Sequence, residues 1–215
     1  GLVILPTGAG KSLVIADIAS RLEGPLLVFQ PSKEILQQNF AKLQSYGISD
    51  CGCYSASVGC KDINRITFAT IGSVMNHMSD FDCFKNIIID ECHYVNSKAG
   101  QYKEFIEAKN RQVVGLTATP YRLDRAEGGS ILKFLTRVRP RIFSKVIYCC
   151  QIGELLSKGY LADLHYYDLT ALDLRRVRSN STGADYDERS LLAEYERCGF
   201  YDKLSNTVVK VLHTK

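Results

Sequence analysis

The segment LPTGAGKS, at residues 5–12, constrains the fold of this chain more than any other feature. It follows an apolar run at residues 2–5 and leads into residues 11–22, whose apolar side chains recur at helical spacing. Two glycines in such a turn let successive backbone amides point at an anion, and the helix N-terminus adds the positive end of its dipole. The pattern therefore predicts a phosphate-binding loop between a strand and a helix.

Each residue of this loop has an expected role. The nucleotide phosphates would be bound by Pro6, Thr7, Gly8, Ala9, Gly10, Lys11 and Ser12. Lys11 would reach the β- and γ-phosphates, and the Ser12 hydroxyl would ligate Mg²⁺. The general pattern has Gly where Leu5 stands, a difference that leaves the amides of residues 8–12 in place.

A second apolar run, at residues 86–90, ends in the adjacent carboxylates Asp90 and Glu91. A strand that ends in Asp-Glu is often only a solvated strand end, but a phosphate-bound metal ion would explain both acids. We expect Asp90 to hold that metal from the strand neighbouring the phosphate loop, and Glu91 to orient or deprotonate the attacking water. His93 follows two residues later and completes the pattern Asp-Glu-x-His.

Three further runs of strand length occur at residues 26–29, 66–69 and 112–117. The apolar runs alternate with helical segments, and several of them are continuously apolar, which is typical of strands buried on both faces of a parallel sheet. Ser32 is expected to cap a helix over residues 32–44. The chain is therefore predicted to be a doubly wound α/β fold with a mostly parallel sheet, whose ligands bind beyond the carboxyl ends of the strands.

These motifs, in this order, resemble those of the superfamily II DExH helicases and nucleic-acid translocases. FQPSKEILQQ (29–38) looks like motif Ia, FATIGSV (68–74) is similar to motif Ib, and GLTATPYRLD (115–124) looks like motif III. The resemblance implies catalytic roles for Lys11, Asp90, Glu91 and His93, with Ser12 and Asp90 as metal ligands. It implies nucleic-acid contacts at Pro31, Ser32, Lys33, Thr70 and Ser73, and coupling between the two sites through Thr117 and Thr119.

The same resemblance implies a RecA-like lobe that uses ATP and Mg²⁺ and acts on DNA, with RNA not excluded. TATPYRLD and the segment from residue 146 onward most resemble RadD-type bacterial DNA-repair helicases and restriction-enzyme motor subunits. We expect residues 1–145 to form an N-terminally truncated ATP-binding lobe, and residues 146–215 to form a connector and the start of a second RecA-like lobe of the same polypeptide. An arginine finger from that second lobe is worth about 10³ to 10⁵ in rate, so this chain alone would be a poor ATPase.

Residues 111–145 hold eight basic and two acidic side chains. Such a stretch could track a nucleic-acid backbone or could be a solvated, amphipathic linker helix, and the sequence leaves both interpretations open. Beyond it, we expect a short helix over residues 151–158, a strand over 160–169, and a final helix from about residue 190 to the end.

The chain has no apolar run of the roughly 18 to 20 residues that a membrane span needs, so we expect a soluble, cytoplasmic protein with no membrane partner. Its eight cysteines have no regular spacing, which favours reduced, buried cysteines over a disulfide scaffold. Cys51, Cys53 and Cys60 form no CxxC pair and have no nearby His, which argues against a zinc site.

Three other interpretations remain. A P-loop kinase or GTPase is disfavoured because a GTPase needs an NKxD-like motif that the sequence lacks, and a kinase needs a lid and an acceptor site. A nucleic-acid-binding module with an inactive nucleotide site is disfavoured by the intact Lys11, Asp90 and Glu91. An RNA helicase lobe would carry the same motifs. All of these predictions require the phosphate loop and the acid pair to face each other.

Overall fold

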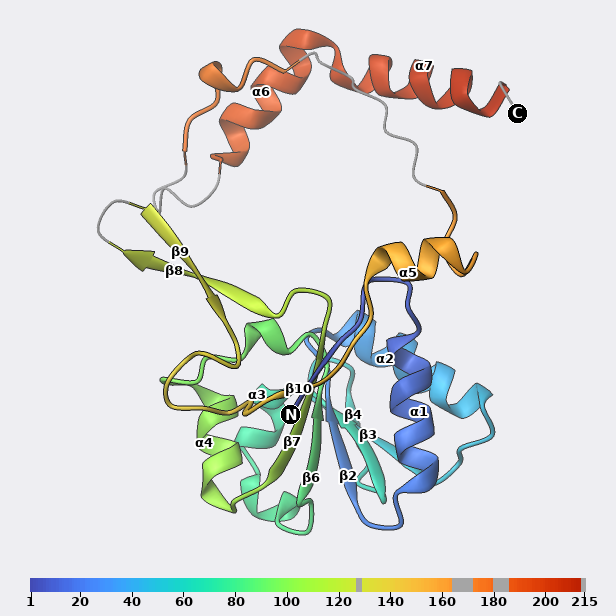
Figure 1. Cartoon of the computed structure of the whole chain (residues 1–215), viewed down its shortest axis with the longest axis vertical. Coiled ribbons are helices and arrows are strands. Elements are labelled where there is room, and N and C mark those ends of the chain that lie inside the picture. The colour runs from blue at the N-terminus through green and yellow to red at the C-terminus, as the bar shows by residue number, and fades with distance from the viewer. Residues whose placement is uncertain (127–128, 164–171, 180–185, 214–215) are drawn as a thin grey trace. The chain divides into compact units, whose positions relative to one another are not determined.

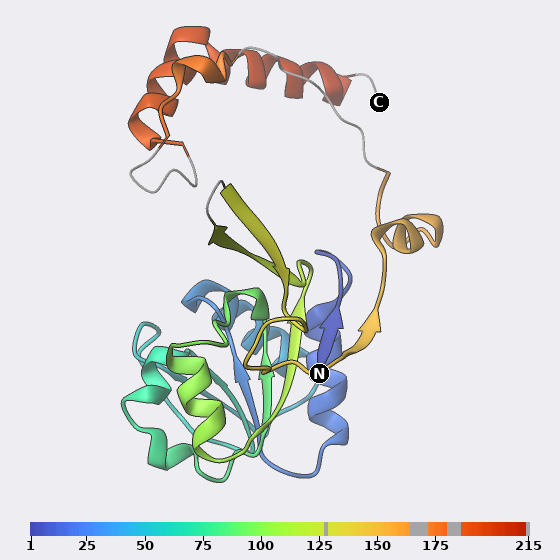
Figure 2. The same cartoon turned by 60° about the vertical axis from the view of Figure 1, so that its left-hand side comes forward.

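Apolar strands and intervening helices build an eight-stranded sheet in the computed structural model of this chain (Figures 1 and 2). The structure describes residues 1–126, 129–163, 172–179 and 186–213. The chain divides into two compact units, Gly1–Ala162 and Asp163–Lys215, and the sheet belongs to the first.

The five apolar runs identified from the sequence all form strands: β1 (Leu2–Ile4), β2 (Leu26–Phe29), β5 (Ile66–Ala69), β6 (Asn86–Ile89) and β7 (Gln112–Thr117). The structure adds β3 (Cys51–Ser55), β4 (Cys60–Lys61) and β10 (Val146–Cys149), in the order β10-β1-β7-β6-β2-β5-β3-β4. Every pairing in this sheet is parallel except that of β3 with β4. The predicted fold class is confirmed.

Helices cover both faces of the sheet. Helices α1 (Lys11–Arg21) and α2 (Lys33–Ser45) pack on one face, and α3 (Ile71–Met75) and α4 (Gln101–Ala108) pack on the other (Figure 1). Along β2, Leu27 and Phe29 join the core beneath α4, whereas Leu26 and Val28 join the core beneath α1. Because successive strand residues point to opposite faces, a strand buried on both sides must be continuously apolar.

The described residues of the basic stretch form no helix. Residues Tyr121–Ala126 (β8) and Gly129–Phe134 (β9) form a separate antiparallel hairpin, so the linker-helix interpretation was wrong. Arg111 is buried, and its guanidinium donates to the carbonyls of Phe81, Phe84 and Phe105 while lying 3.9 Å from the Phe105 ring centroid. Arg111 therefore holds α4 against the sheet and does not face a nucleic acid.

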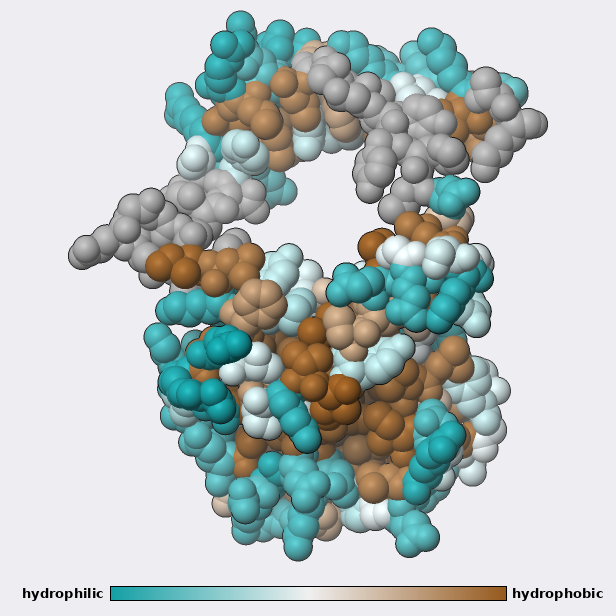
Figure 3. All heavy atoms as spheres, in the orientation of Figure 1, coloured by the Kyte–Doolittle hydropathy of each residue, from teal (hydrophilic) through white to brown (hydrophobic). Residues whose placement is uncertain are grey.

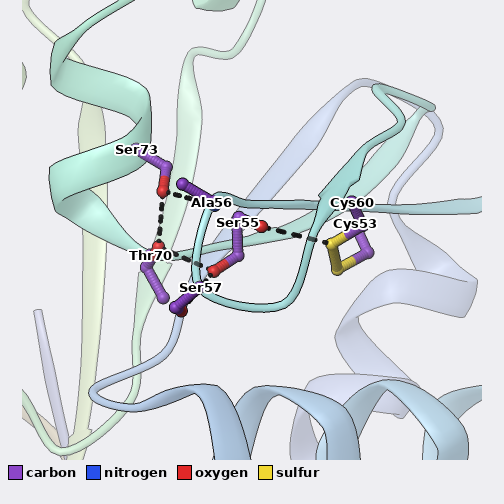
Figure 4. Close-up of a disulfide and its surroundings, with 7 residues drawn as sticks. All are labelled: Cys53, Ser55, Ala56, Ser57, Cys60, Thr70 and Ser73. Carbon is purple, nitrogen blue, oxygen red and sulfur yellow. Dashed lines mark hydrogen bonds between the residues drawn. A yellow bond between two sulfur atoms is a disulfide. The ribbon is translucent and has the colours of Figure 1, made fainter.

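The expectation of reduced cysteines also needs correction. Cys53 and Cys60 form a disulfide that ties β3 to β4 at the edge of the sheet (Figure 4). This disulfide was not predicted because a single pair of cysteines seven residues apart matches no disulfide spacing pattern. The two cysteines come together only because β3 and β4 pair as an antiparallel hairpin. The other six cysteines are free; Cys51, Cys92 and Cys150 are buried, as expected, whereas Cys83 and Cys149 are exposed.

The C-terminal part of the chain follows the predicted order with one break. Helix α5 (Ile152–Ser157) lies within the predicted segment, while residues 160–163 form no strand and residues 164–171 lie outside the described part of the chain. In the second unit, α6 (Glu188–Cys198) and α7 (Phe200–His213) replace the single predicted helix. Gly199 separates them because it adopts a left-handed conformation at φ 61°.

The boundary predicted at residue 145 falls just before β10, which pairs with β1 and so extends the sheet of the first unit. Within the described ranges, no helix has the length and apolar character to cross a membrane. Figure 3 shows hydrophobic side chains at the surface between α1 and α4, where a groove is lined by residues that include Ile18, Leu22 and Val114.

Candidate functional site

The predicted phosphate loop joins the end of β1 to the start of α1. Gly8 and Gly10 adopt left-handed conformations, with φ of 82° and 85°, which an L-residue with a Cβ rarely adopts. Gly10 occupies the N-cap of α1, and no side chain in the described residues caps that helix. The first amides of α1 are therefore left to an external acceptor, as an anion-binding helix N-terminus requires.

The acid pair faces this loop. Asp90 and Glu91 directly follow β6, and Glu91 Oε1 lies 2.9 Å from the ammonium nitrogen of Lys11. We had expected Asp90 to come from the strand next to the phosphate loop, but this was wrong, because β7 lies between β1 and β6. Asp90 still lies at the same edge of the sheet as the phosphate loop, because all three strands are parallel and their carboxyl ends share that edge.

Glu91 has an unusual backbone. Its φ is 48°, in the left-handed region, and it caps a short 3₁₀ helix, η2 (Cys92–Tyr94). For a residue with a Cβ this conformation costs about 1–2 kcal/mol. Such strain is typical of functional sites, where the surrounding structure holds a side chain in a required direction. Here that direction is toward Lys11.

Asp90 is buried, with 4% of its surface exposed. Burial, followed by the neighbouring charge of Glu91, raises the pKa of Asp90 above its ordinary value. The backbone amide of Glu91 and the side chain of Asn39 donate to the two Asp90 oxygens at 3.0 and 3.2 Å, which partly offsets that rise. Asp90 is thus a fixed carboxylate that lacks a full counter-charge.

Asn39 on α2 was not among the predicted site residues. Its amide oxygen accepts from Ser12 Oγ at 3.0 Å, and its amide nitrogen donates to Asp90 Oδ2 at 3.2 Å and to Gln30 Oε1 at 3.0 Å. It therefore bridges the two predicted metal ligands. The sequence offered little sign of this role, because a single Asn in a polar helix has no characteristic spacing.

The two predicted coupling residues converge on His93. His93 Nδ1 lies 3.0 Å from Thr117 Oγ1, 3.2 Å from Thr119 Oγ1 and 3.3 Å from Glu91 Oε2. Thr117 Oγ1 also accepts from the Thr119 backbone amide at 3.0 Å, which fixes the turn after β7. A continuous polar path therefore joins Glu91 to the end of β7.

The five predicted nucleic-acid contacts come just after two neighbouring strands, β2 and β5. Pro31, Ser32 and Thr70 line a cleft of about 590 Å³ together with Glu91 and His93, among others. The Ser32 hydroxyl caps α2 by accepting from the Ile35 amide. The structure thus brings three of the five predicted contacts beside the acid pair.

The other two contacts, Lys33 and Ser73, lie on α2 and α3 next to these cleft residues. Ser73 and Thr70 are also engaged with the β3–β4 turn. Ser73 Oγ accepts from the Ala56 amide at 2.9 Å, and Thr70 Oγ1 is 3.1 Å from Ser55 Oγ (Figure 4). These hydroxyls therefore already have protein partners.

The donor set fits Mg²⁺ and a triphosphate. Mg²⁺ prefers oxygen ligands, and Ser12 Oγ and Asp90 Oδ2 are both within hydrogen-bonding distance of the one Asn39 side chain. Lys11 and the uncapped start of α1 provide positive charge on the phosphate side. In the described residues no cluster of His, Cys, Asp and Glu forms a separate metal site.

Several known proteins are similar to this chain in sequence or fold. The family model ResIII, described as type III restriction enzyme, res subunit, matches residues 1–122. Rad25 of Haloarcula marismortui, whose name describes a DNA 3′-5′ helicase, is 27% identical over 217 residues and is matched over 90% of this chain. QP509L of African swine fever virus (isolate Pig/Kenya/KEN-50/1950), whose name describes an ATP-dependent RNA helicase, is 30% identical over 165 residues and is matched over 73% of it.

This chain spans about a third of the length of these relatives, 33% and 32% respectively. Among solved structures, a nuclease-deletion mutant of the type ISP restriction-modification enzyme LlaGI, in complex with a DNA substrate mimic, aligns with a TM-score of 0.53. That alignment is 16% identical and covers 74% of this chain and 18% of the other. It supports the fold of a RecA-like lobe.

Proposed function

Because the chain belongs to the ResIII family, that of the type III restriction enzyme res subunit, we propose that it is the first motor lobe of an ATP-dependent DNA helicase or translocase. Helicases and translocases are its relatives. The contact between Lys11 and Glu91, at 2.9 Å, carries the proposal. It places the phosphate-loop lysine next to the acid of the Asp-Glu-x-His motif, so that both side chains would lie close to the same bound phosphate group.

In this proposal the loop residues hold the phosphates of ATP, and Ser12 and Asp90 hold Mg²⁺. When bound, Mg²⁺ supplies charge neutralisation at the transferred phosphoryl group. Lys11 exchanges its Glu91 partner for phosphate oxygens. Glu91, released from Lys11 and beside His93, then orients and deprotonates water.

His93, Thr117 and Thr119 would couple the state of the bound nucleotide to nucleic-acid binding. A change at Glu91 alters its contact with His93, which shares hydrogen bonds with both threonines. The cleft lined by Pro31, Ser32 and Thr70 is also lined by Glu91 and His93 and would hold the nucleic-acid backbone. Lobe closure on ATP binding would then drive movement along the strand.

The finer assignments are also proposals. The RadD-type and restriction-motor resemblance favours DNA and a cytoplasmic role in repair or restriction. Residues 1–145 would be the ATP-binding lobe, and the following residues would lead into a second RecA-like lobe that supplies the arginine finger. RNA is the second candidate substrate, since QP509L is described as an RNA helicase.

The test compares Glu91→Gln and Lys11→Ala in a polypeptide that contains both lobes. We expect Glu91→Gln to bind Mg·ATP normally while losing nucleic-acid-stimulated phosphate release, and Lys11→Ala to lose both. Glu23→Gln is the matched control, because Glu23 is exposed beyond the far end of α1. Parallel assays with DNA and RNA oligonucleotides identify the substrate. Unchanged turnover in Glu91→Gln would rule out the proposed mechanism.

A further inference from the structure

A second cavity lies beside the site but outside it. Its volume is about 80 Å³, and it is bounded by the loop after η2, by the base of the β8–β9 hairpin and by the segment that leads to β10. The lining residues are Val95, Asn96, Ser97, Lys98, Arg122, Lys133, Leu135, Val138, Ile142 and Phe143. No residue of the phosphate loop belongs to this described lining, so the cavity is distinct from the nucleotide site.

The cavity carries positive charge. Lys98, Arg122 and Lys133 line it, and none of its described lining residues is acidic. Arg122 and Lys133 stand directly opposite each other in the register of β8 and β9, so their side chains share one face of the hairpin. The cationic side chains of Lys98 and Arg122 would attract an anion that enters the cavity.

The cavity also has a hydroxyl group without a partner. Ser97 is 9% exposed, and its Oγ makes no hydrogen bond in the described part of the chain. Buried polar groups nearly always have a partner, which is often a ligand or a bound water where the protein supplies none. Next to it, Arg122 Nη1 donates to the Tyr94 carbonyl at 3.4 Å, which anchors the guanidinium at this position.

The size of the cavity and its apolar wall limit which ligands it can bind. A bound water needs about 10–15 Å³ of such a volume, so the cavity holds a few oxygen-sized groups and no nucleobase. Leu135, Val138 and Phe143 form part of its wall, and Phe143 is 2% exposed. Because an apolar wall lowers the local dielectric, it strengthens the attraction between cations and an anion.

We propose that this cavity binds a phosphate group through Ser97, Lys98 and Arg122. The shape and charge are satisfied by any phosphate, and the position favours a phosphate of a nucleic-acid backbone. Tyr94 lines the cleft beside Glu91, and its carbonyl holds Arg122 at the cavity. The phosphate-binding step is independent of the proposed motor function, whereas its assignment to a nucleic acid rests on that function.

The experiment has two arms. In the first, calorimetry measures inorganic phosphate binding in a Lys11→Ala background, so that the phosphate loop does not contribute. We expect Arg122→Gln and Ser97→Ala each to lower phosphate affinity at least fivefold. Arg122→Lys, which keeps the charge, should retain most of it. Lys61→Gln, an exposed cation on β4 at the far edge of the sheet, is the matched control and should change nothing.

In the second arm, otherwise unaltered protein and the same variants bind a fluorescent single-stranded oligonucleotide over a range of salt concentrations. We expect Arg122→Gln to weaken binding and to reduce the salt slope by about one. Phosphate affinity that is the same in all variants would overturn the cavity proposal. Reduced phosphate affinity with unchanged oligonucleotide affinity would support the cavity and overturn its assignment to the nucleic acid. If the unaltered protein binds no oligonucleotide, the proposed function fails while the first arm still tests the cavity.

Discussion

Asn39 shows how one uncharged side chain can organise a charged site. Ser12 and Asp90 come from α1 and from the end of β6, and both contact the Asn39 amide. An amide suits this position because it accepts from the hydroxyl and donates to the carboxylate at the same time. Asn39 therefore acts as a positioning residue for the two predicted metal ligands, and it does not need to contact the nucleotide.

We expect Asn39→Ala to weaken Mg·ATP binding about tenfold. A hydrogen bond to a charged group is worth about 1.5–3 kcal/mol, and part of that loss should be recovered by water. Titration with a fluorescent ATP analogue, with Mg²⁺ and then with EDTA, measures the effect. Gln37→Ala, at an exposed position on the same helix, is the control. An equal loss of affinity in EDTA would contradict a role at the metal ligands.

Gly115 on β7 allows close packing behind the acid pair. A Cβ at this position would lie 2.6 Å from Cys92 Sγ and 2.6 Å from a Phe143 ring carbon. We expect Gly115→Ala to destabilise the protein by about 1–3 kcal/mol, the usual cost of overpacking. Gly153→Ala in α5, where a Cβ meets nothing within 4 Å, should be neutral or stabilising. Thermal unfolding of both variants measures the difference, and equal melting temperatures would contradict this account.

At the scale of elements, the β3–β4 hairpin connects a disulfide to two predicted nucleic-acid contacts. Cys53–Cys60 closes the hairpin, and its turn supplies the Ala56 amide to Ser73 and the Ser55 hydroxyl to Thr70 (Figure 4). Constraining this turn in the unfolded chain stabilises the fold by about 2 kcal/mol. The same constraint fixes the partners of Thr70 and Ser73.

We expect Cys60→Ser to lower the free energy of unfolding by about 2 kcal/mol. The free energy of unfolding of this variant should not change when a reductant is added. The unaltered protein should lose the same stability when dithiothreitol is added. Cys83→Ser, at an exposed free cysteine, is the control. Denaturant titration with and without dithiothreitol measures both effects. A reductant-insensitive unaltered protein would show that this disulfide does not form in solution.

Helix α6 depends on a single buried carboxylate. Glu194 accepts from the Arg197 guanidinium at 2.6 and 2.7 Å and from the Asp173 amide at 3.0 Å. The Arg197 hydrogen bonds first, and the Asp173 amide second, lower the pKa of Glu194 from 4.5 to about 2. The carboxylate therefore ties α6 to the residues around η3 (Leu174–Arg176) within the second unit.

A lowered pKa stabilises the folded state above the ordinary pKa, and that stability is lost as pH falls through the folded value. We therefore expect the second unit to keep this contribution above pH 4.5 and to lose it progressively toward pH 2. Glu194→Gln should be less stable near neutral pH and should lack this acid-dependent loss. Chemical denaturation followed by helical circular dichroism at several pH values tests this. Parallel pH profiles for the two proteins would contradict it.

For the whole molecule, the features that could be predicted from the sequence are those set by continuous apolar runs and by glycine-containing turns. Five of the eight strands of the sheet, the phosphate loop and the position of Asp90 and Glu91 at one sheet edge follow from patterns in consecutive residues, whereas β3, β4 and β10 did not. The order of β1, β7 and β6 did not follow, because sequence periodicity does not report which strands pair. The left-handed backbone conformation of Glu91 could not be predicted either, because Glu is not a residue type that favours this conformation.

Features that depend on tertiary contacts were missed. Arg111 looked like a surface cation, yet three backbone carbonyls and an aromatic ring satisfy it in the core. The β8–β9 hairpin was predicted as a possible helix because basic residues suit either structure. Asn39 gave no signal because its role depends on two partners from distant segments.

The catalytic capacity of the whole chain follows from the charges around the site. In the described part of the chain, Lys11, Asp90 and Glu91 form hydrogen bonds and ion pairs with Asn39, with His93 and with one another, and none of these partners is an arginine. Phosphoryl transfer without an arginine finger is slower by about 10³ to 10⁵. We therefore expect these 215 residues to bind Mg·ATP but to release phosphate at least about 10³ times more slowly than a polypeptide that includes the proposed second RecA-like lobe.

Phosphate release under single-turnover conditions, with and without DNA, measures this difference. Lys11→Ala in the longer polypeptide is the control for contaminating ATPases. DNA should accelerate phosphate release by the longer polypeptide and leave release by the 215-residue chain slow, because in the proposed mechanism the accelerating step is a closure that brings in positive charge from the second lobe. Rapid, DNA-stimulated release by the 215-residue chain alone would mean that its own residues complete the site, and the proposed need for a second lobe would then be wrong.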